Sequence, residues 1–261
     1  MSRSFGNPRI DLDVVTSTND VARAAVREGV AHGALFTARH QTRGRGRRAA
    51  TWIDQPGESA LMSFVVYPDF PIADAWVLSF AAALAASEAL VGLGARAAIK
   101  WPNDILVLGG KAGGVLVEAV PAIAGRWAAI IGIGINVGQR SFVQAEAYPI
   151  PPTSLRIALG ERAPDTEQLI RIVAECLARR LAECDRPDRR EKLLASWRAM
   201  LQTGAMQAGI CAATGRRVVG ILRDVRLSDG FAMLEEENGT FTIARPVETY
   251  SAPVGAEANQ V

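Results

Sequence analysis

The chain has 261 residues, of which 49% are hydrophobic, so it can bury a substantial core. Its 29 lysines and arginines nearly balance its 27 aspartates and glutamates, which excludes a protein that is cationic over its whole surface. We therefore expect a globular protein with one large and one small domain, in which any cationic site arises from local clustering.

The cysteines and the apolar segments indicate the compartment. Cys176, Cys184 and Cys211 have no short paired spacing, and residues 1–10 lack the apolar core of a secretory signal. Both features favour a reducing environment, and we expect a cytoplasmic protein. The most apolar stretch, residues 75–93, is long enough to cross a membrane, but it is rich in alanine and contains two serines and a glutamate. We expect a buried core helix there and no membrane contact.

Apolar periodicity predicts closely spaced strands and helices in the first half of the chain. Strands are predicted at residues 10–15, 35–38, 61–67, 96–100, 105–108, 115–119 and 128–137. Ser17 with Asp20 resembles a capping box that starts a helix ending near residue 28. Residues 41–59 have no periodicity and predict a long loop. This pattern indicates an α+β fold with a mixed or antiparallel sheet flanked by helices.

The second half of the chain changes from helical to strand periodicity. After a proline-rich link, apolar faces predict helices over residues 169–181 and 192–201. From residue 203 the apolar period becomes two, and glycines separate the short strands, which predicts a small SH3-like β-barrel. We expect a large domain at residues 1–202, the barrel domain at 203–252 and a disordered tail at 253–261.

An arginine-rich loop is the first chemical motif. Five arginines fall within residues 39–48, with no acid among them. At Gly44, Arg45, Gly46 and Arg47 glycine alternates with arginine, so the backbone can approach a ligand while guanidinium groups reach anionic oxygens, such as those of phosphate. A solvated basic loop or an arginine–glycine tether for nucleic acid would have the same composition. The loop alone leaves these alternatives open.

A lysine at the end of a predicted strand is the second motif. Lys100 follows an apolar run and precedes the sequence Trp-Pro-Asn-Asp at residues 101–104. Because the proline forces a turn straight after it, the lysine is expected to point into a cleft. A lysine that lies on the surface and extends its ammonium group into water is the alternative.

Three other patterns do not support a site on their own. Residues 110–114 lack the Ser/Thr and the upstream glycine of a Walker loop, and Gly132 with Gly134 lacks the third glycine of a dinucleotide fingerprint. The only histidines, His32 and His40, form no convincing metal-ligand set with the scattered cysteines. We expect no protein-bound metal site.

Taken in order, five motifs resemble the biotin protein ligase family. They are Ser17-Thr18-Asn19, Gln41 with Gly44 to Arg48 and Trp52, Lys100 to Asp104, Gly110-Lys111 with Gly113-Gly114 and Glu118, and Gly132 to Asn136. No single motif decides the matter, but the joint match in family order across residues 10–137, followed by a small β-domain, is highly specific. Residues 139–261 match by architecture more than by motif.

The resemblance implies an activity and its partners. An enzyme of this family forms biotinyl-5′-AMP from biotin and ATP, then transfers biotin to one lysine of a biotin carboxyl carrier protein, part of acetyl-CoA carboxylase or another biotin-dependent carboxylase. Mg²⁺ would be held through the ATP phosphates. Family members are often dimers, which leaves room for a homodimer.

The resemblance also implies roles for individual residues. Those around biotin would be Ser17, Thr18, Asn19, Gln41, Gly44, Arg45, Gly46, Arg47, Lys100, Gly113, Gly114 and Gly132. Those around ATP would be Arg45, Arg47, Arg48, Trp52, Lys100, Asn103 and Asn136. Lys100 and Arg45 would be catalytic, because fixed cations offset the repulsion between a carboxylate and the α-phosphate that it attacks. The closed arginine loop would keep water away from the adenylate.

Two departures from the family pattern qualify these expectations. Ala49-Ala50 stands where the family usually continues with glycine and arginine, which removes a cation and a flexible hinge and bears on how well the adenylate is retained. No helix-turn-helix segment precedes residue 10, so we expect no specific DNA binding.

Two alternatives remain, of which the second belongs to a different functional class. One is a lipoate or octanoate ligase or transferase of the same fold, against which the arginine–glycine loop and residues 100–104 argue. The other is a non-catalytic module that binds biotin or nucleic acid. Lys100 beside the arginine loop disfavours a non-catalytic biotin-binding module, and the near-neutral total charge disfavours a nucleic-acid-binding one.

Overall fold

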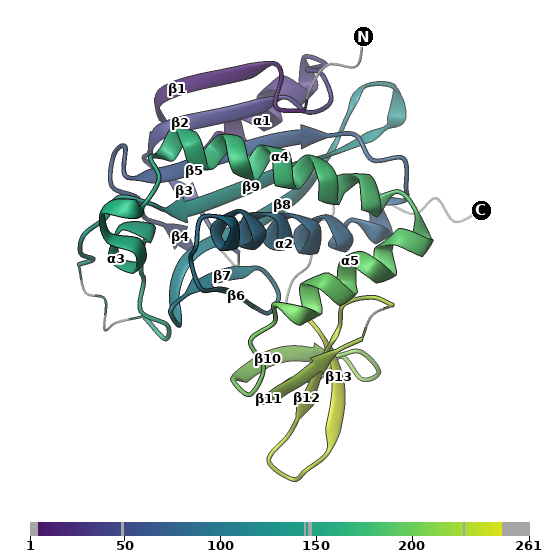
Figure 1. The fold of residues 1–261 in the computed structure, drawn as a ribbon. Helices are drawn as coiled ribbons and strands as arrows, with labels where there is room; N and C mark the ends of the chain where they lie inside the picture. Colours follow the sequence, from purple (N-terminus) through teal and green to yellow (C-terminus); the bar gives the residue numbers. More distant parts are fainter. Residues whose placement is uncertain (1–4, 48–49, 144, 146–147, 227, 247–261) are drawn as a thin grey trace.

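A mixed seven-stranded sheet is the largest sheet of the protein (Figure 1). The computed structural model describes residues 5–47, 50–143, 145, 148–226 and 228–246. The strands in spatial order are β1 (Arg9–Val15), β2 (Leu35–Gln41), β5 (Ser59–Val66), β9 (Trp127–Asn136), β8 (Gly110–Pro121), β7 (Asp104–Val107) and β6 (Ala97–Lys100). Only β1 and β2 pair in parallel within this sheet, and every other neighbouring pair is antiparallel. The predicted α+β class is confirmed.

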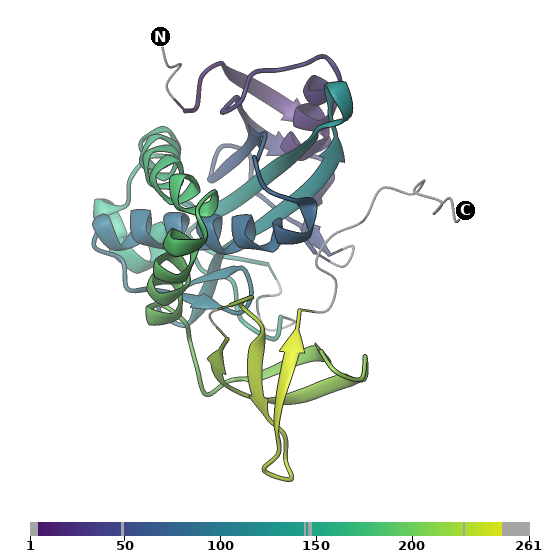
Figure 2. The same cartoon turned by 90° about the vertical axis from the view of Figure 1, so that its right-hand side faces the viewer.

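Helices cover both faces of the sheet, and each face has its own apolar core. On one face α2 (Trp76–Gly92) packs on β6 to β9, and α4 (Thr166–Cys184) and α5 (Pro187–Ala199) pack on α2 (Figures 1 and 2). On the other face α1 (Thr18–Arg27) packs on β2, β5 and β9. Strand β5 is buried on both faces, in keeping with its mostly apolar sequence.

Helix α2 matches the helix predicted over residues 75–93. The apolar helical segment Ile72–Gly92 has the length and composition of a membrane span, but most of it is buried inside the protein. The predicted interpretation as a core helix is therefore confirmed.

Some local predictions were wrong, because long-range contacts override local pattern. Ser17 is the N-cap residue of α1, but its side chain makes no capping hydrogen bond, and the carboxylate of Asp20 pairs with Arg45. The predicted loop contains a small hairpin of β3 (Gly44–Arg45) and β4 (Thr51–Trp52). Helix α3 (Leu155–Leu159) was not predicted, and α5 begins at Pro187, five residues before the predicted start at 192.

The C-terminal strands close into the predicted small barrel. It consists of β10 (Met206–Cys211), β11 (Arg217–Val225), β12 (Ala232–Glu235) and β13 (Phe241–Arg245), around a core that includes Val218, Leu222 and Leu234. The boundary at residues 202 and 203 stays a prediction. The predicted tail and the last residues of the predicted barrel domain, 247–261, lie outside the described residues.

Backbone contacts tie the segment before the barrel to β6, and a side-chain contact ties the barrel itself to the turn after β6. The amide of Ile99 donates to the carbonyl of Met200 at 2.7 Å, and the amide of Gln202 donates to the carbonyl of Ile99 at 2.8 Å. The indole N–H of Trp101 donates to the carbonyl of Gly230 at 3.2 Å. The barrel is thereby fixed beside Lys100.

Candidate functional site

A cavity of about 440 Å³ lies where the sheet, the arginine-rich loop, residues 100–104 and β10 meet. The residues predicted from the sequence that line it are Ser17, Thr18, Asn19, Gln41, Arg45, Gly46, Arg47, Trp52, Lys100, Asn103, Gly114 and Gly132. Gly44 lines an adjacent cavity of about 770 Å³, which shares Arg45, Gly46 and Arg47 with the first. Gly113 and Asn136 line neither cavity, and Arg48 lies outside the described residues.

Polar side chains converge at the start of α1. Gln41 Oε1 accepts hydrogen bonds from the amide of Thr18 at 2.8 Å and from its hydroxyl at 3.1 Å. The hydroxyl of Ser63 lies 2.7 Å from Thr18 Oγ1 and 2.6 Å from Asn19 Oδ1. Ser63 is fully buried, and the sequence did not single it out, because it stands within an apolar strand. A β-carbon at Gly132 would lie too close to Asn19 Oδ1, so any larger residue there would displace the Asn19 amide.

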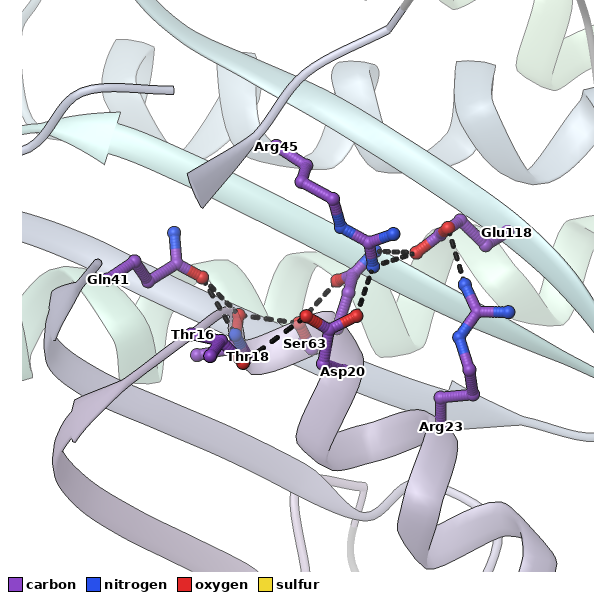
Figure 3. A network of polar contacts seen from close by, with 9 residues as sticks. Thr16, Thr18, Asp20, Arg23, Gln41, Arg45, Ser63 and Glu118 are labelled. Atoms are coloured by element: carbon purple, nitrogen blue, oxygen red, sulfur yellow. Dashed lines mark hydrogen bonds and ion pairs between the residues drawn. The ribbon is translucent and has the colours of Figure 1, made fainter. Parts of the chain in front are cut away.

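Glu118 joins this polar cluster to the arginine loop (Figure 3). Its Oε2 accepts from Asn19 Nδ2 at 2.7 Å and pairs with Arg45 Nη2 at 3.0 Å, while its Oε1 pairs with Arg23 at 2.6 Å. Arg45 also pairs with Asp20 at 2.8 Å. The carboxylates of Glu118 and Asp20 thus hold the guanidinium of Arg45 next to Asn19.

Two lysines share one carboxylate inside the cavity. Lys111 Nζ lies 2.7 Å from Asp104 Oδ1, and Lys100 Nζ lies 3.7 Å from Asp104 Oδ2. Lys111 was not among the residues expected in the site. The signal was its position in the glycine-rich motif at residues 110–114, and the β7–β8 hairpin brings it back to Asp104.

The arginine loop also contacts the turn after Lys100. Arg47 Nη1 donates to Asn103 Oδ1 at 3.0 Å, and the Asn103 amide donates to the carbonyl of Val115. Ala50, one of the two residues that depart from the family pattern, lines the cavity, and its carbonyl accepts from the amide of Gly46 at 2.7 Å. The loop is therefore closed by backbone bonding on one side and by Asn103 on the other.

Trp52 and Asn136 were both expected beside ATP, and the structure places them differently. Trp52 lines the cavity against Gly134, and its indole N–H is buried without a hydrogen-bond partner among the described residues. Asn136 is buried and donates to the carbonyl of Thr153 at 3.0 Å, and the Thr153 amide donates to the carbonyl of Lys111 at 2.9 Å. Asn136 therefore supports the backbone that flanks Lys111.

The charge of the cavity determines which ligands it suits. Arg45, Arg47, Lys100 and Lys111 line it with one carboxylate, Asp104, while Asp20 and Glu118, which pair with Arg45, are not among the lining residues. Two of the three lysines in the whole sequence thus lie in one cavity. Four fixed cations beside an uncharged polar cluster can bind a ligand with one neutral polar end and one strongly anionic end, and can stabilise further negative charge there.

The chain belongs to the biotin/lipoate A/B protein ligase family, whose family model matches residues 12–136. Within that family it is 36% identical to the biotin–[acetyl-CoA-carboxylase] ligase of Paracoccus denitrificans, over 65% of this chain and 72% of that protein. It is 32% identical to the Mycobacterium tuberculosis ligase of the same name, over 82% of this chain and 79% of that protein. The family expectation is confirmed.

Longer relatives and solved structures were also found. The chain is 35% identical to the bifunctional ligase/repressor BirA of Bacillus subtilis over 67% of its own length, but it spans only 54% of BirA. The biotin protein ligase of Aquifex aeolicus in complex with biotin and ATP superposes with a TM-score of 0.75 at 25% identity, covering 92% of this chain and 96% of that one. The Leishmania major ligase with biotinyl-5-AMP, at 22% identity and a TM-score of 0.59, has the same fold.

Proposed function

We propose that the protein is a biotin protein ligase, which activates biotin as biotinyl-5′-AMP and transfers it to a lysine of a biotin carboxyl carrier protein. The observation that carries the proposal is the cavity itself. It joins the polar cluster at Thr18, Asn19 and Gln41 to four cations that include Lys100 and Lys111. Biotin has a neutral ureido ring at one end and a carboxylate at the other, and ATP adds a polyanion at the carboxylate end.

The polar cluster suits the ureido ring. Its donors and acceptors are already oriented by Ser63 and Glu118, so the ring can exchange bonds to water for bonds to fixed partners. Because Gly132 has no side chain, the Asn19 amide can occupy the space beside it. Ser17, Thr18, Asn19 and Gln41 are the biotin-binding residues in this proposal.

The cations act where the two substrates meet. A carboxylate oxygen of biotin attacks the α-phosphorus of ATP, the bond to the bridging oxygen breaks, and pyrophosphate leaves with its electron pair. Lys100, Lys111 and Arg45 offset the repulsion between these anions and the charge that develops on the phosphorus oxygens. Mg²⁺ would accompany the ATP phosphates and neutralise the leaving pyrophosphate.

In the second step the carrier lysine, as a neutral amine, attacks the acyl carbon of the mixed anhydride. The new amide bond forms as AMP leaves, and the amine gives up a proton. Arg45, Gly46 and Arg47 of the loop line the cavity, which supports a role in excluding water until the carrier arrives. We also propose that the acceptor is a biotin carboxyl carrier protein, that the protein is cytoplasmic and that it forms a homodimer.

A single assay tests the reaction and its closest alternative. The protein is incubated with ATP, Mg²⁺, a biotin carboxyl carrier domain and either biotin, lipoate or octanoate, and the carrier mass is measured. We expect the biotin adduct only, and only when ATP is present. Transfer of lipoate or octanoate in place of biotin would refute the substrate, and no transfer of any acid would refute the enzymatic function.

A further inference from the structure

A glutamine from the barrel extends into the cavity with its amide nitrogen unpaired. Gln207 lies on β10, lines the cavity and is only 7% exposed. Its Nε2 is buried and has no hydrogen-bond partner in the part of the chain that the structure describes. A buried amide N–H without an acceptor is destabilising, so a ligand that supplies the acceptor would be favoured at this position.

The order of strands in the sheet places Gln207 far from the polar cluster at Thr18, Asn19 and Gln41. Residues two apart on a strand face the same side, and a β-carbon at Gly209 would lie 3.5 Å from the ring of Trp101, which follows Lys100 at the end of β6. Strands β9 and β6 are separated by β8 and β7, so Gly132 and Lys100 are roughly 14 Å apart across the sheet. Gln207 therefore lies at the Lys100 end of the cavity.

The surrounding charge indicates the kind of acceptor. This cavity contains four cations and one carboxylate, and an amide nitrogen can only donate. We propose that Gln207 is a nucleotide-binding residue supplied by the C-terminal barrel, and that its Nε2 donates a hydrogen bond to a phosphate oxygen of ATP. This inference rests on the proposed ligase function and adds a specific barrel residue to its nucleotide site.

Three substitutions at this position test the sign of the interaction. Gln207→Leu keeps the volume and removes the donor, Gln207→Glu replaces the donor with an anion, and Gln207→Lys places a cation there. The same three substitutions at Gln202, which precedes the barrel and does not line the cavity, are matched controls for charge and shape. Each variant is measured for the KM of ATP by pyrophosphate release, for the Kd of ATP and of biotin by calorimetry, and for the ligand-free Tm.

The expected pattern separates ligand binding from structural support. Gln207→Leu should raise the KM and Kd for ATP about tenfold or more, because a hydrogen bond to a charged group is lost. Its Kd for biotin should stay within about twofold, and its ligand-free Tm should be equal or higher, because an unpaired buried amide is gone. Gln207→Glu should weaken ATP binding more than Gln207→Leu does. Gln207→Lys should bind ATP at least as well as the parent, and the Gln202 variants should bind it as the parent does.

Other outcomes overturn the inference. An unchanged affinity for ATP in Gln207→Leu, a loss confined to biotin, or tighter ATP binding by Gln207→Glu than by Gln207→Lys would each exclude a bond to phosphate. If the parent protein formed no biotinyl-5′-AMP, the proposed function would fail by itself. The calorimetric affinity for ATP would still decide the role of Gln207.

Discussion

Replacing Lys111 should damage adenylate formation more than replacing Lys100. Both lysines flank Asp104, but Lys111 is the closer partner, at 2.7 Å against 3.7 Å. Lys100→Ala leaves the closer ion pair intact. Lys111→Ala removes a cation and also leaves the carboxylate of Asp104 less well compensated, so a negative charge faces the incoming biotin carboxylate and phosphate.

The magnitude follows from the two effects. Removal of one preorganised electrostatic group costs about 3–4 kcal/mol, a fall of roughly 10²–10³-fold in rate, and we expect this for Lys100→Ala. The rate of Lys111→Ala should be lower still. Adding Asp104→Asn to Lys111→Ala should recover part of that further loss of rate. Because these charges matter most in the transition state, biotin affinity should change by less than about tenfold. Lys100→Arg should not restore the full rate, since a planar guanidinium cannot take the place of a compact ammonium group.

Pyrophosphate release at saturating biotin and ATP, combined with calorimetric titration of biotin, measures both quantities. Lys192→Ala, at the only other lysine of the chain and exposed on α5, is the control. A Lys111→Ala enzyme that turned over within about threefold of the parent would remove Lys111 from the chemistry. A double mutant no faster than Lys111→Ala would show that Asp104 is not the source of the extra loss.

Three further predictions concern other parts of the structure. Gly132→Ala should weaken biotin binding about tenfold or more, because the new methyl group displaces the Asn19 amide, and unchanged affinity by calorimetry would contradict this. Asp20→Asn should lower the KM for ATP by about 1.5- to 5-fold, because an ion pair that competes for Arg45 is lost, whereas a raised KM would make Asp20 a positioning residue. Burial raises the pKa of the Cys184 thiol from 9.0 to about 12, so its contribution to stability is complete below pH 9 and is lost as the pH rises towards 12. Between pH 8 and 11 the Tm of the parent should therefore fall more steeply than that of Cys184→Ala, and parallel curves would refute the assignment.

Local sequence signals predicted the parts of the site that depend on local structure. Lys100 ends an apolar strand and a proline follows it, so its position near a turn could be inferred from its neighbours. The N-cap position of Ser17 was likewise visible. The capping box predicted there does not form, and the carboxylate of Asp20 pairs instead with Arg45, which is distant in sequence.

The unpredicted residues depend on tertiary structure. Lys111 reaches Asp104 only through the register of a hairpin, in which a bulge shifts the pairing between Ile105 and Leu106. Gln207 reaches the cavity only because the barrel packs against Trp101, and no periodicity in the barrel sequence indicates which face packs there. Lys111 lies outside the strand predicted at residues 115–119, because β8 begins at Gly110, whereas Gln207 lies within the predicted barrel.

Because most lysines of the chain lie in the cavity, few of them are available for biotinylation by the adenylate that the proposed ligase forms. A biotinyl-adenylate acylates any accessible neutral amine, whereas a guanidinium group stays protonated and unreactive at physiological pH. Only three of the 29 basic residues are lysines, and Lys192 alone lies outside the cavity. By carrying its positive charge almost entirely on arginine, the protein offers an escaped activated acid very few side chains of its own to modify, so stray biotin would label neighbouring proteins.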